Sequence, residues 1–240
     1  MRYMVSLMES NVKAPLYLIL ARVAGVWALA NVGYYLLFGL AGVGLSYNEA
    51  PVFIAAYFAF WAGITVLYFR DVYMRWLLLE SRIWVSVLAS LSFAALLTGL
   101  LYLLSQLPVL QGPALVPYSD LLFASLLDFL PKAAEILVQQ LFITVVVLDL
   151  AHRYHALRSV IVGYMACFGG SHVLLYLLVT ATPQYAAVMI GMSVLSAFVF
   201  PYLILRVRSG FLYTYMLHTL FYVAFALATH AWPPPGYIGG

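Results

Sequence analysis

Residues 16–40 read LYLILARVAGVWALANVGYYLLFGL, a run in which Arg22 carries the only charge. A helix that crosses the hydrocarbon core of a bilayer needs about 20 mostly apolar residues. The run is too long for the apolar region of a cleavable signal peptide, and no small-residue cleavage motif is evident near its end. We therefore expect it to stay in the membrane as a spanning helix.

The rest of the chain has the same character. Hydrophobic residues make up 66% of the 240 residues and charged residues only 8%, against roughly a quarter charged in a soluble domain. Further apolar runs predict six more spanning helices, at residues 52–69, 83–104, a fourth ending at 150, then 157–180, 185–205 and 211–232. Pro131 interrupts the fourth run, which predicts a kinked or surface-lying piece before it and a spanning helix after it. The fold class predicted is an all-α polytopic membrane bundle of seven transmembrane helices, forming a single membrane domain over residues 1–240.

Lysines and arginines occur in alternate loops of this arrangement. They are Arg2 and Lys13 before the first helix, Arg70, Arg75 and Arg82 after the second, Arg153 and Arg158 after the fourth, and Arg206 and Arg208 after the sixth. The other flanks, including the C-terminal tail, have none. Because such residues favour the cytoplasmic side, we expect the N-terminus inside and the C-terminus outside. The protein is then an integral multi-pass protein, expected in the cytoplasmic (plasma) membrane.

The charge of the chain excludes one large class of partners. Eleven Lys and Arg residues and a net charge of +3 are too few and too scattered for the basic surface that nucleic acids require. The expected partner is the lipid bilayer. The single cysteine, Cys167, excludes an intrachain disulfide.

Three ionisable residues fall deep inside predicted helices. An ionisable side chain at the bilayer centre costs about 2.5–3.5 kcal/mol on insertion scales, so each requires a physical reason. Glu135, His172 and His218 lie on three separate helices, and a rise of 1.5 Å per residue puts them within about one turn of depth of one another. The sequence therefore predicts that they converge on a polar pocket. Gly169 and Gly170, beside His172, would let another group approach closely.

Each of these residues has a neighbour one turn away on the same helix face. Gln139 follows Glu135, Phe168 precedes His172, and Tyr222 follows His218, all at a spacing of four residues. The motifs therefore read Ala134-Glu135-x-x-x-Gln139, Phe168-x-x-x-His172 and His218-x-x-x-Tyr222.

This order of motifs resembles that of the CAAX-processing endopeptidases and bacteriocin-processing proteins, the CPBP or Abi membrane proteases. That family has Glu-Glu-x-x-x-Arg on one helix, Phe-x-x-x-His on the next and, after one intervening helix, His-x-x-x-Asn. The resemblance covers residues 132–222, so the helices within 16–104 are accessory to it. Ala134 or Ile136 replaces one glutamate, Gln139 or Gln140 replaces the arginine, and Tyr222 replaces the asparagine.

The resemblance implies an intramembrane endopeptidase that cleaves a membrane-associated peptide or protein. It would make Glu135 the general base, His172 its partner in orienting water, and His218 a donor to the oxyanion. Tyr222 would supply a phenolic donor where the family has asparagine.

Two alternatives stay open at this point. Glu135, His172 and His218 form an acceptable zinc set, but no other carboxylate at that depth would then remain as a base, so we favour a site without a cofactor. The loss of motif residues favours a different class, a non-catalytic subunit or scaffold of a membrane complex that retains the protease-like fold.

Overall fold

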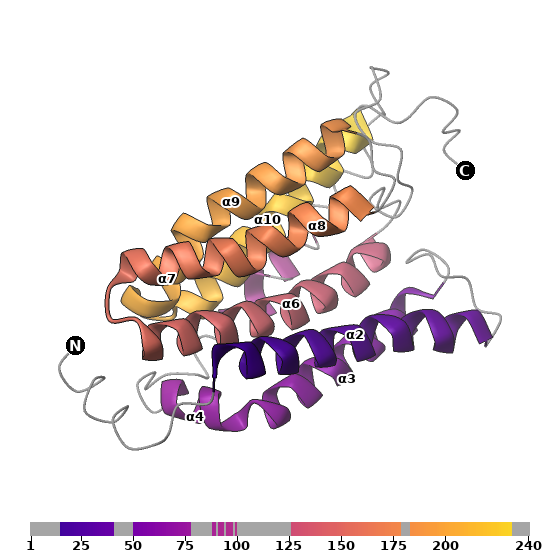
Figure 1. Cartoon of the computed structure of the whole chain (residues 1–240). Coiled ribbons are helices and arrows are strands. Elements are labelled where there is room, and N and C mark those ends of the chain that lie inside the picture. The colour runs from indigo at the N-terminus through magenta and orange to yellow at the C-terminus, as the bar shows by residue number, and fades with distance from the viewer. Residues whose placement is uncertain are drawn as a thin grey trace.

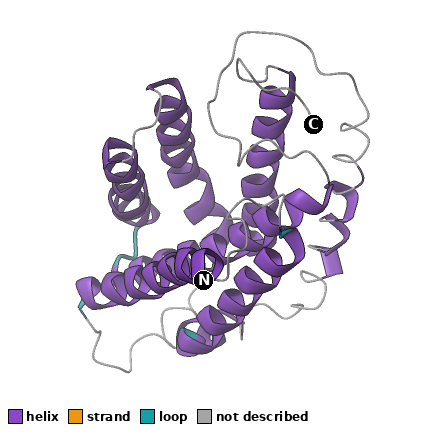
Figure 2. Cartoon of the chain, turned by 90° about the vertical axis from the view of Figure 1, so that its right-hand side faces the viewer, coloured by secondary structure: helices purple, strands orange, loops and turns teal. Residues whose placement is uncertain are grey.

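The computed structural model describes residues 15–40, 50–77, 126–178 and 183–231, and between them residues 88, 89, 91–93, 95–97 and 99. Every element in these ranges is a helix, and short turns join several of them (Figure 2). The part of the predicted third span that is described is helical. The rest of that span and the connector at residues 106–119 lie outside the described residues.

The elements follow one another as a series of helices of very different length (Figure 1). They are α2 (Leu16–Leu40), α3 (Pro51–Tyr68), α4 (Arg70–Leu77), α6 (Leu126–Arg153), α7 (Leu157–Tyr164), the π-helical turn η2 (Met165–Gly169), α8 (Gly170–Leu178), α9 (Pro183–Arg206) and α10 (Gly210–Ala231).

Helix α6 is the centre of the bundle. It lies between α2 and α3 on one side and the group of α7 to α10 on the other (Figure 1). Its residues from Leu141 to Leu148 are all buried, as is typical of a helix that is apolar on every face. One face packs Val138 and Phe142 against α2 and α3, and another packs Ile143 and Val147 against α7 and α9.

Five helices in the described ranges are long and apolar enough to cross a membrane. They are Leu16–Leu37, Pro51–Tyr68, Phe129–Arg153, Leu157–Leu174 and Ala186–Arg206. Large apolar side chains, among them Trp27, Phe53 and Phe198, are exposed on the outside of these helices. The structure is therefore that of a membrane-embedded helical protein. Helix α10 occupies the position of the predicted seventh span.

Pro131 does not end the fourth helix, because α6 runs without a break from Leu126 through Pro131 to Arg153. The proline lies near the beginning of α6, so its missing N–H and its ring disturb only the first turns. The piece before Pro131, predicted to be kinked or surface-lying, belongs from Leu126 onward to the same helix. Residues 120–125 lie outside the described ranges.

Arg22 is held by the end of α3. Its Nη2 donates to the backbone oxygen of Tyr68 at 3.4 Å and its Nε to the Tyr68 hydroxyl at 3.3 Å. The guanidinium carbon also lies 4.7 Å from the centre of the Tyr68 ring. Because Tyr68 is the last residue of α3, the cation stabilises the carbonyl end of that helix and ties α2 to it.

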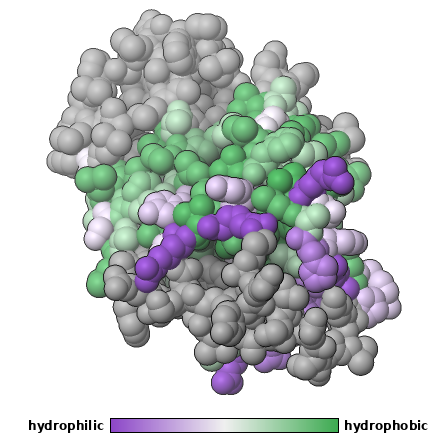
Figure 3. All heavy atoms as spheres, turned by 90° about the vertical axis from the view of Figure 1, so that its left-hand side faces the viewer, coloured by the Kyte–Doolittle hydropathy of each residue, from purple (hydrophilic) through white to green (hydrophobic). Residues whose placement is uncertain are grey.

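Basic residues gather at one end of the bundle. Arg70 begins α4, Arg153 ends α6, and Arg206 ends α9, and these helix ends lie on the same side in Figure 1. Figure 3 views that end and shows hydrophilic side chains among the hydrophobic ones.

Gly33 is required where α2 meets α3. The Tyr57 hydroxyl donates to the Ala30 oxygen at 2.5 Å, and a Cβ at position 33 would lie 2.7 Å from that hydroxyl. Gly33→Ala is expected to destabilise the protein by about 1 kcal/mol, because overpacking outweighs the better helix propensity of alanine. Gly25→Ala on the same helix meets nothing within 4 Å and should be neutral or stabilising. Thermal unfolding of both variants in detergent checks this, and equal midpoints would contradict it.

Candidate functional site

A cavity of about 170 Å³ lies among η2, α8, α9 and α10. Four residues that the sequence singled out line it: Phe168, His172, His218 and Tyr222. The other lining residues are Met189, Met192, Ser193, Leu195, Ser196, Val199, Phe200, Leu217 and Phe221. The predicted motifs on the fifth and seventh spans therefore meet at one place, and α9 supplies the remaining wall.

The π-helical turn η2 positions the Phe168-x-x-x-His172 motif. His172 Nδ1 lies 2.9 Å from the Phe168 carbonyl oxygen. A carbonyl only accepts, so Nδ1 is the donor and carries the proton. The two rings lie 4.3 Å apart between centres, and Phe168 in turn stacks on Tyr164 at 5.2 Å. π-Helical turns inside α-helices are frequent at functional sites, and this one fixes the ring of His172 beside the cavity.

His218 enters the cavity from α10. Its ring lies 5.9 Å from Phe200 and 5.6 Å from Tyr222, measured between ring centres. Its Nδ1 is buried and has no hydrogen-bond partner among the described residues. A buried polar atom without a partner costs about 1–3 kcal/mol, so this nitrogen is a candidate to bind a substrate group.

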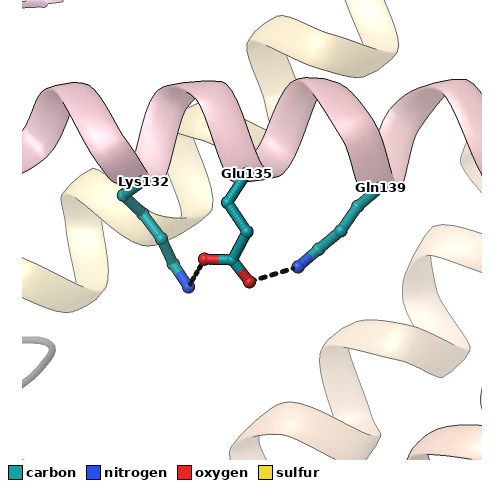
Figure 4. A network of polar contacts seen from close by, with 3 residues as sticks. All are labelled: Lys132, Glu135 and Gln139. Carbon is teal, nitrogen blue, oxygen red and sulfur yellow. Dashed lines mark hydrogen bonds and ion pairs between the residues drawn. The ribbon is translucent and has the colours of Figure 1, made fainter. Parts of the chain in front are cut away.

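Glu135 belongs to a network on one face of α6 (Figure 4). Its Oε2 lies 2.7 Å from Lys132 Nζ, and its Oε1 accepts a hydrogen bond of 2.8 Å from Gln139 Nε2. The side chains of Lys132 and Glu135 are 11% and 20% exposed, so the pair is largely withdrawn from solvent. Glu135 is not among the residues that line the cavity.

Tyr222 connects the network to the cavity. Lys132 Nζ lies 4.4 Å from the centre of the Tyr222 ring, and Tyr222 is a lining residue. The structure therefore brings the two histidines to one cavity and places the acid beside that cavity, in contact with it through Lys132 and Tyr222.

The two glutamines that could replace the family's arginine have different neighbours. Gln139 shares the face of Glu135, as the contact above shows. Gln140 is fully buried, and its Nε2 donates to Thr214 Oγ1 on α10 at 2.7 Å. Gln139 is thus the residue on the side of the acid, and Gln140 holds α6 against α10.

Sequence reasoning missed the contribution of α9. Met189, Met192, Ser193 and Ser196 line the cavity, and their spacing of three and four residues places them on one helix face. That spacing was the available signal.

The zinc set considered from the sequence has its three residues in different surroundings. His172 and His218 line the cavity, whereas Glu135 binds Lys132 and Gln139 beside it. In the described ranges, no three His, Cys, Asp or Glu side chains are grouped closely enough to hold a metal ion.

No protein-family model, curated protein or solved structure matches this chain.

Proposed function

We propose that the protein is an intramembrane endopeptidase that cleaves a membrane-associated peptide or protein, resembling the CAAX-processing proteases. One observation carries this proposal: His172 and His218, from two helices, line one cavity together with Tyr222, beside the acid Glu135. Ionisable side chains inside membrane-spanning helices are costly, and they usually have a functional reason.

We propose seven transmembrane helices with the N-terminus in the cytoplasm and the C-terminus outside. The basic residues at the ends of α6 and α9 and at the start of α4 support this orientation, since they lie at one end of the bundle. The cytoplasmic (plasma) membrane remains the proposed location.

In the proposed reaction, Glu135 and His172 activate a water molecule for attack on the carbonyl carbon of a peptide bond. The proton of the water passes to this pair, the oxygen of the carbonyl becomes an oxyanion, and N–H of His218 and O–H of Tyr222 donate to it. When the C–N bond breaks, the proton is returned to the leaving amine. No metal takes part in this scheme.

The contacts of Glu135 are compatible with a role as base. The bonds from Lys132 and Gln139 hold the carboxylate in one orientation, and a general base needs such a fixed orientation. Lys132 also supplies next to the acid the positive charge that the arginine provides in the resembled family.

Glu135→Gln and His172→Ala are each expected to eliminate cleavage while the protein remains folded. The first removes the proposed base and the second its partner, and general acid–base groups contribute roughly 10²–10⁴-fold to a rate. The measurement compares new N-termini of membrane proteins in cells that express the wild-type chain or a variant.

The matched controls change the same residue types outside the site. Asp71→Asn alters an exposed carboxylate at the start of α4, and His155→Ala alters an exposed imidazole between α6 and α7. Both controls should retain the cleavage products of the wild type. Unchanged products in both Glu135→Gln and His172→Ala would reject the protease function.

The second candidate is a non-catalytic subunit or scaffold of a membrane complex. The ion pair of Glu135 with Lys132 favours it, because a carboxylate that serves only to balance a lysine on its own helix needs no access to water. Purification of the wild-type protein with stoichiometric partners, retained in Glu135→Gln and His172→Ala, would support this candidate over the enzyme.

A further inference from the structure

We propose that the cavity among α8, α9 and α10 binds the acyl chain of a bilayer phospholipid, which enters sideways from the membrane. The proposal starts from the direction in which the cavity opens. Leu195 and Leu217 are 53% and 43% exposed, whereas Met189 and Ser193 are each 4% exposed. All four residues line the cavity, so it extends from the outer surface of α9 and α10 to a buried floor.

The opening lies at the depth of the hydrocarbon. Leu195 is near the middle of α9 (Pro183–Arg206), and at 1.5 Å per residue it lies roughly 16 Å from Arg206 along the axis. Around it, Val194, Phe198 and Leu220 are exposed and apolar. At this depth the molecules outside the protein are the acyl chains of lipids, because the bilayer core is about 30 Å thick and contains no water.

The inside of the cavity is suited to such a chain. Most of the lining side chains are apolar, and the two serines of α9 use their hydroxyl groups within the helix. Ser193 Oγ donates to the Ile190 oxygen at 2.8 Å, and Ser196 Oγ donates to the Ser193 oxygen at 2.7 Å. An apolar cavity of about 150 Å³ takes up small hydrocarbons, and the cavity here, which has about 170 Å³, is of similar size.

Two methionines make the lining of the cavity adaptable. Met189 and Met192 have unbranched side chains that adjust to an irregular guest. A chain bound there lies against His172 and His218, which line the same space. A peptide that reaches the histidines from this side must therefore displace a lipid chain. This binding does not depend on catalysis, and it holds for an enzyme and for a scaffold alike.

The test uses the purified full-length protein in phosphatidylcholine vesicles that contain a phosphatidylcholine with a diazirine near the end of one acyl chain. After illumination, mass spectrometry maps the residues that carry lipid adducts. We expect adducts concentrated on Met189, Met192 and Phe221. Ser196→Phe fills the cavity and should lower these adducts roughly tenfold, the factor that corresponds to burial of about two methylene groups. Val194→Phe, on the outer face of the same helix, should leave them unchanged.

A further variant and a second lipid probe test the proposal independently of Ser196→Phe. Leu217→Phe narrows the opening from the exposed side and should also lower the adducts, even if Ser196→Phe fails to fold. A phosphatidylcholine with the diazirine on its headgroup should not label Met189. Adducts no more frequent in the cavity than on the outer face of α9, or equal labelling from the headgroup, would overturn the proposal. Cleavage by Glu135→Gln and His172→Ala is measured in a separate experiment. A failure of the lipid proposal can therefore be distinguished from a failure of the protease proposal.

Discussion

Gly210→Ala is expected to be strongly destabilising, by about 3 kcal/mol, because the added methyl group would clash with backbone atoms near the end of α9. A Cβ at position 210 would lie 1.8 Å from the oxygen of Leu203 and 2.9 Å from the nitrogen of Ile204. Neither atom can move without shifting the last turn of α9, and overpacking of this kind costs about 1–3 kcal/mol even where side chains can yield. Thermal or denaturant unfolding in detergent measures the loss.

Gly191→Ala, within α9, is the control for Gly210→Ala. A Cβ at position 191 meets nothing within 4 Å, so this variant should be neutral or slightly stabilising. If Gly210→Ala unfolds at the same temperature as Gly191→Ala, the tight contact with Leu203 does not exist in the protein.

Lys132→Met is the second change with a large expected effect, a loss of about 3 kcal/mol. Removing one partner of a largely buried ion pair leaves an uncompensated charge, which costs about 3–5 kcal/mol when burial is complete. The partial exposure of Glu135 places the expected value at the lower end. Lys132→Met also removes the cation that lies against the Tyr222 ring.

The double variant Lys132→Met/Glu135→Gln separates charge from packing. With no charge left on either side, it should recover most of the stability that Lys132→Met loses, because a neutral pair of similar volume is often tolerated. Unfolding of the single and double variants, compared with Glu135→Gln alone, gives the coupling energy. A double variant as unstable as Lys132→Met would show that the ion pair is not the reason for the loss.

The spanning helices could be predicted because the membrane imposes their length and composition. The boundaries of α2 match the predicted run at residues 16–40, and those of α9 and α10 agree within two residues of the predictions. The effect of Pro131 was harder to predict. A proline beyond the first turn of a helix removes one backbone hydrogen bond and often kinks or ends the helix, and the sequence alone does not show that α6 continues through Pro131.

The site was predictable only where its residues repeat along one helix. Phe168 and His172 lie together because a spacing of four residues joins them on any helix, and the same holds for Glu135 and Gln139. The position of Glu135 beside the cavity, and not on its wall, depends on how α6 is rotated against α10. The contact between Gln140 and Thr214 fixes that rotation, and a pairing between distant helices leaves no local pattern.

The wall that α9 contributes was missed for a related reason. Methionine and serine are ordinary residues in a membrane helix, and nothing in the type of Met189 or Ser193 marks a cavity. The exposure of Met189 and Ser193, 4% each, indicates a cavity only when it is compared with the 53% exposure of Leu195 on the same helix. Burial of this kind follows from packing and is not encoded in a short stretch of sequence.

The π turn at Met165–Gly169 determines the direction in which His172 points, through the way in which the chain is wound there. A π turn accommodates one residue more than an α-helix would, so everything after it is rotated by about 100° from an uninterrupted helix. If these residues were wound as an ordinary α-helix with none deleted, His172 would move about 100° around the axis, away from α9 and α10. Deleting one residue would instead remove the π turn and leave His172 facing α9 and α10. In any set of related chains, a one-residue gap at this point is therefore compatible with the paired histidines.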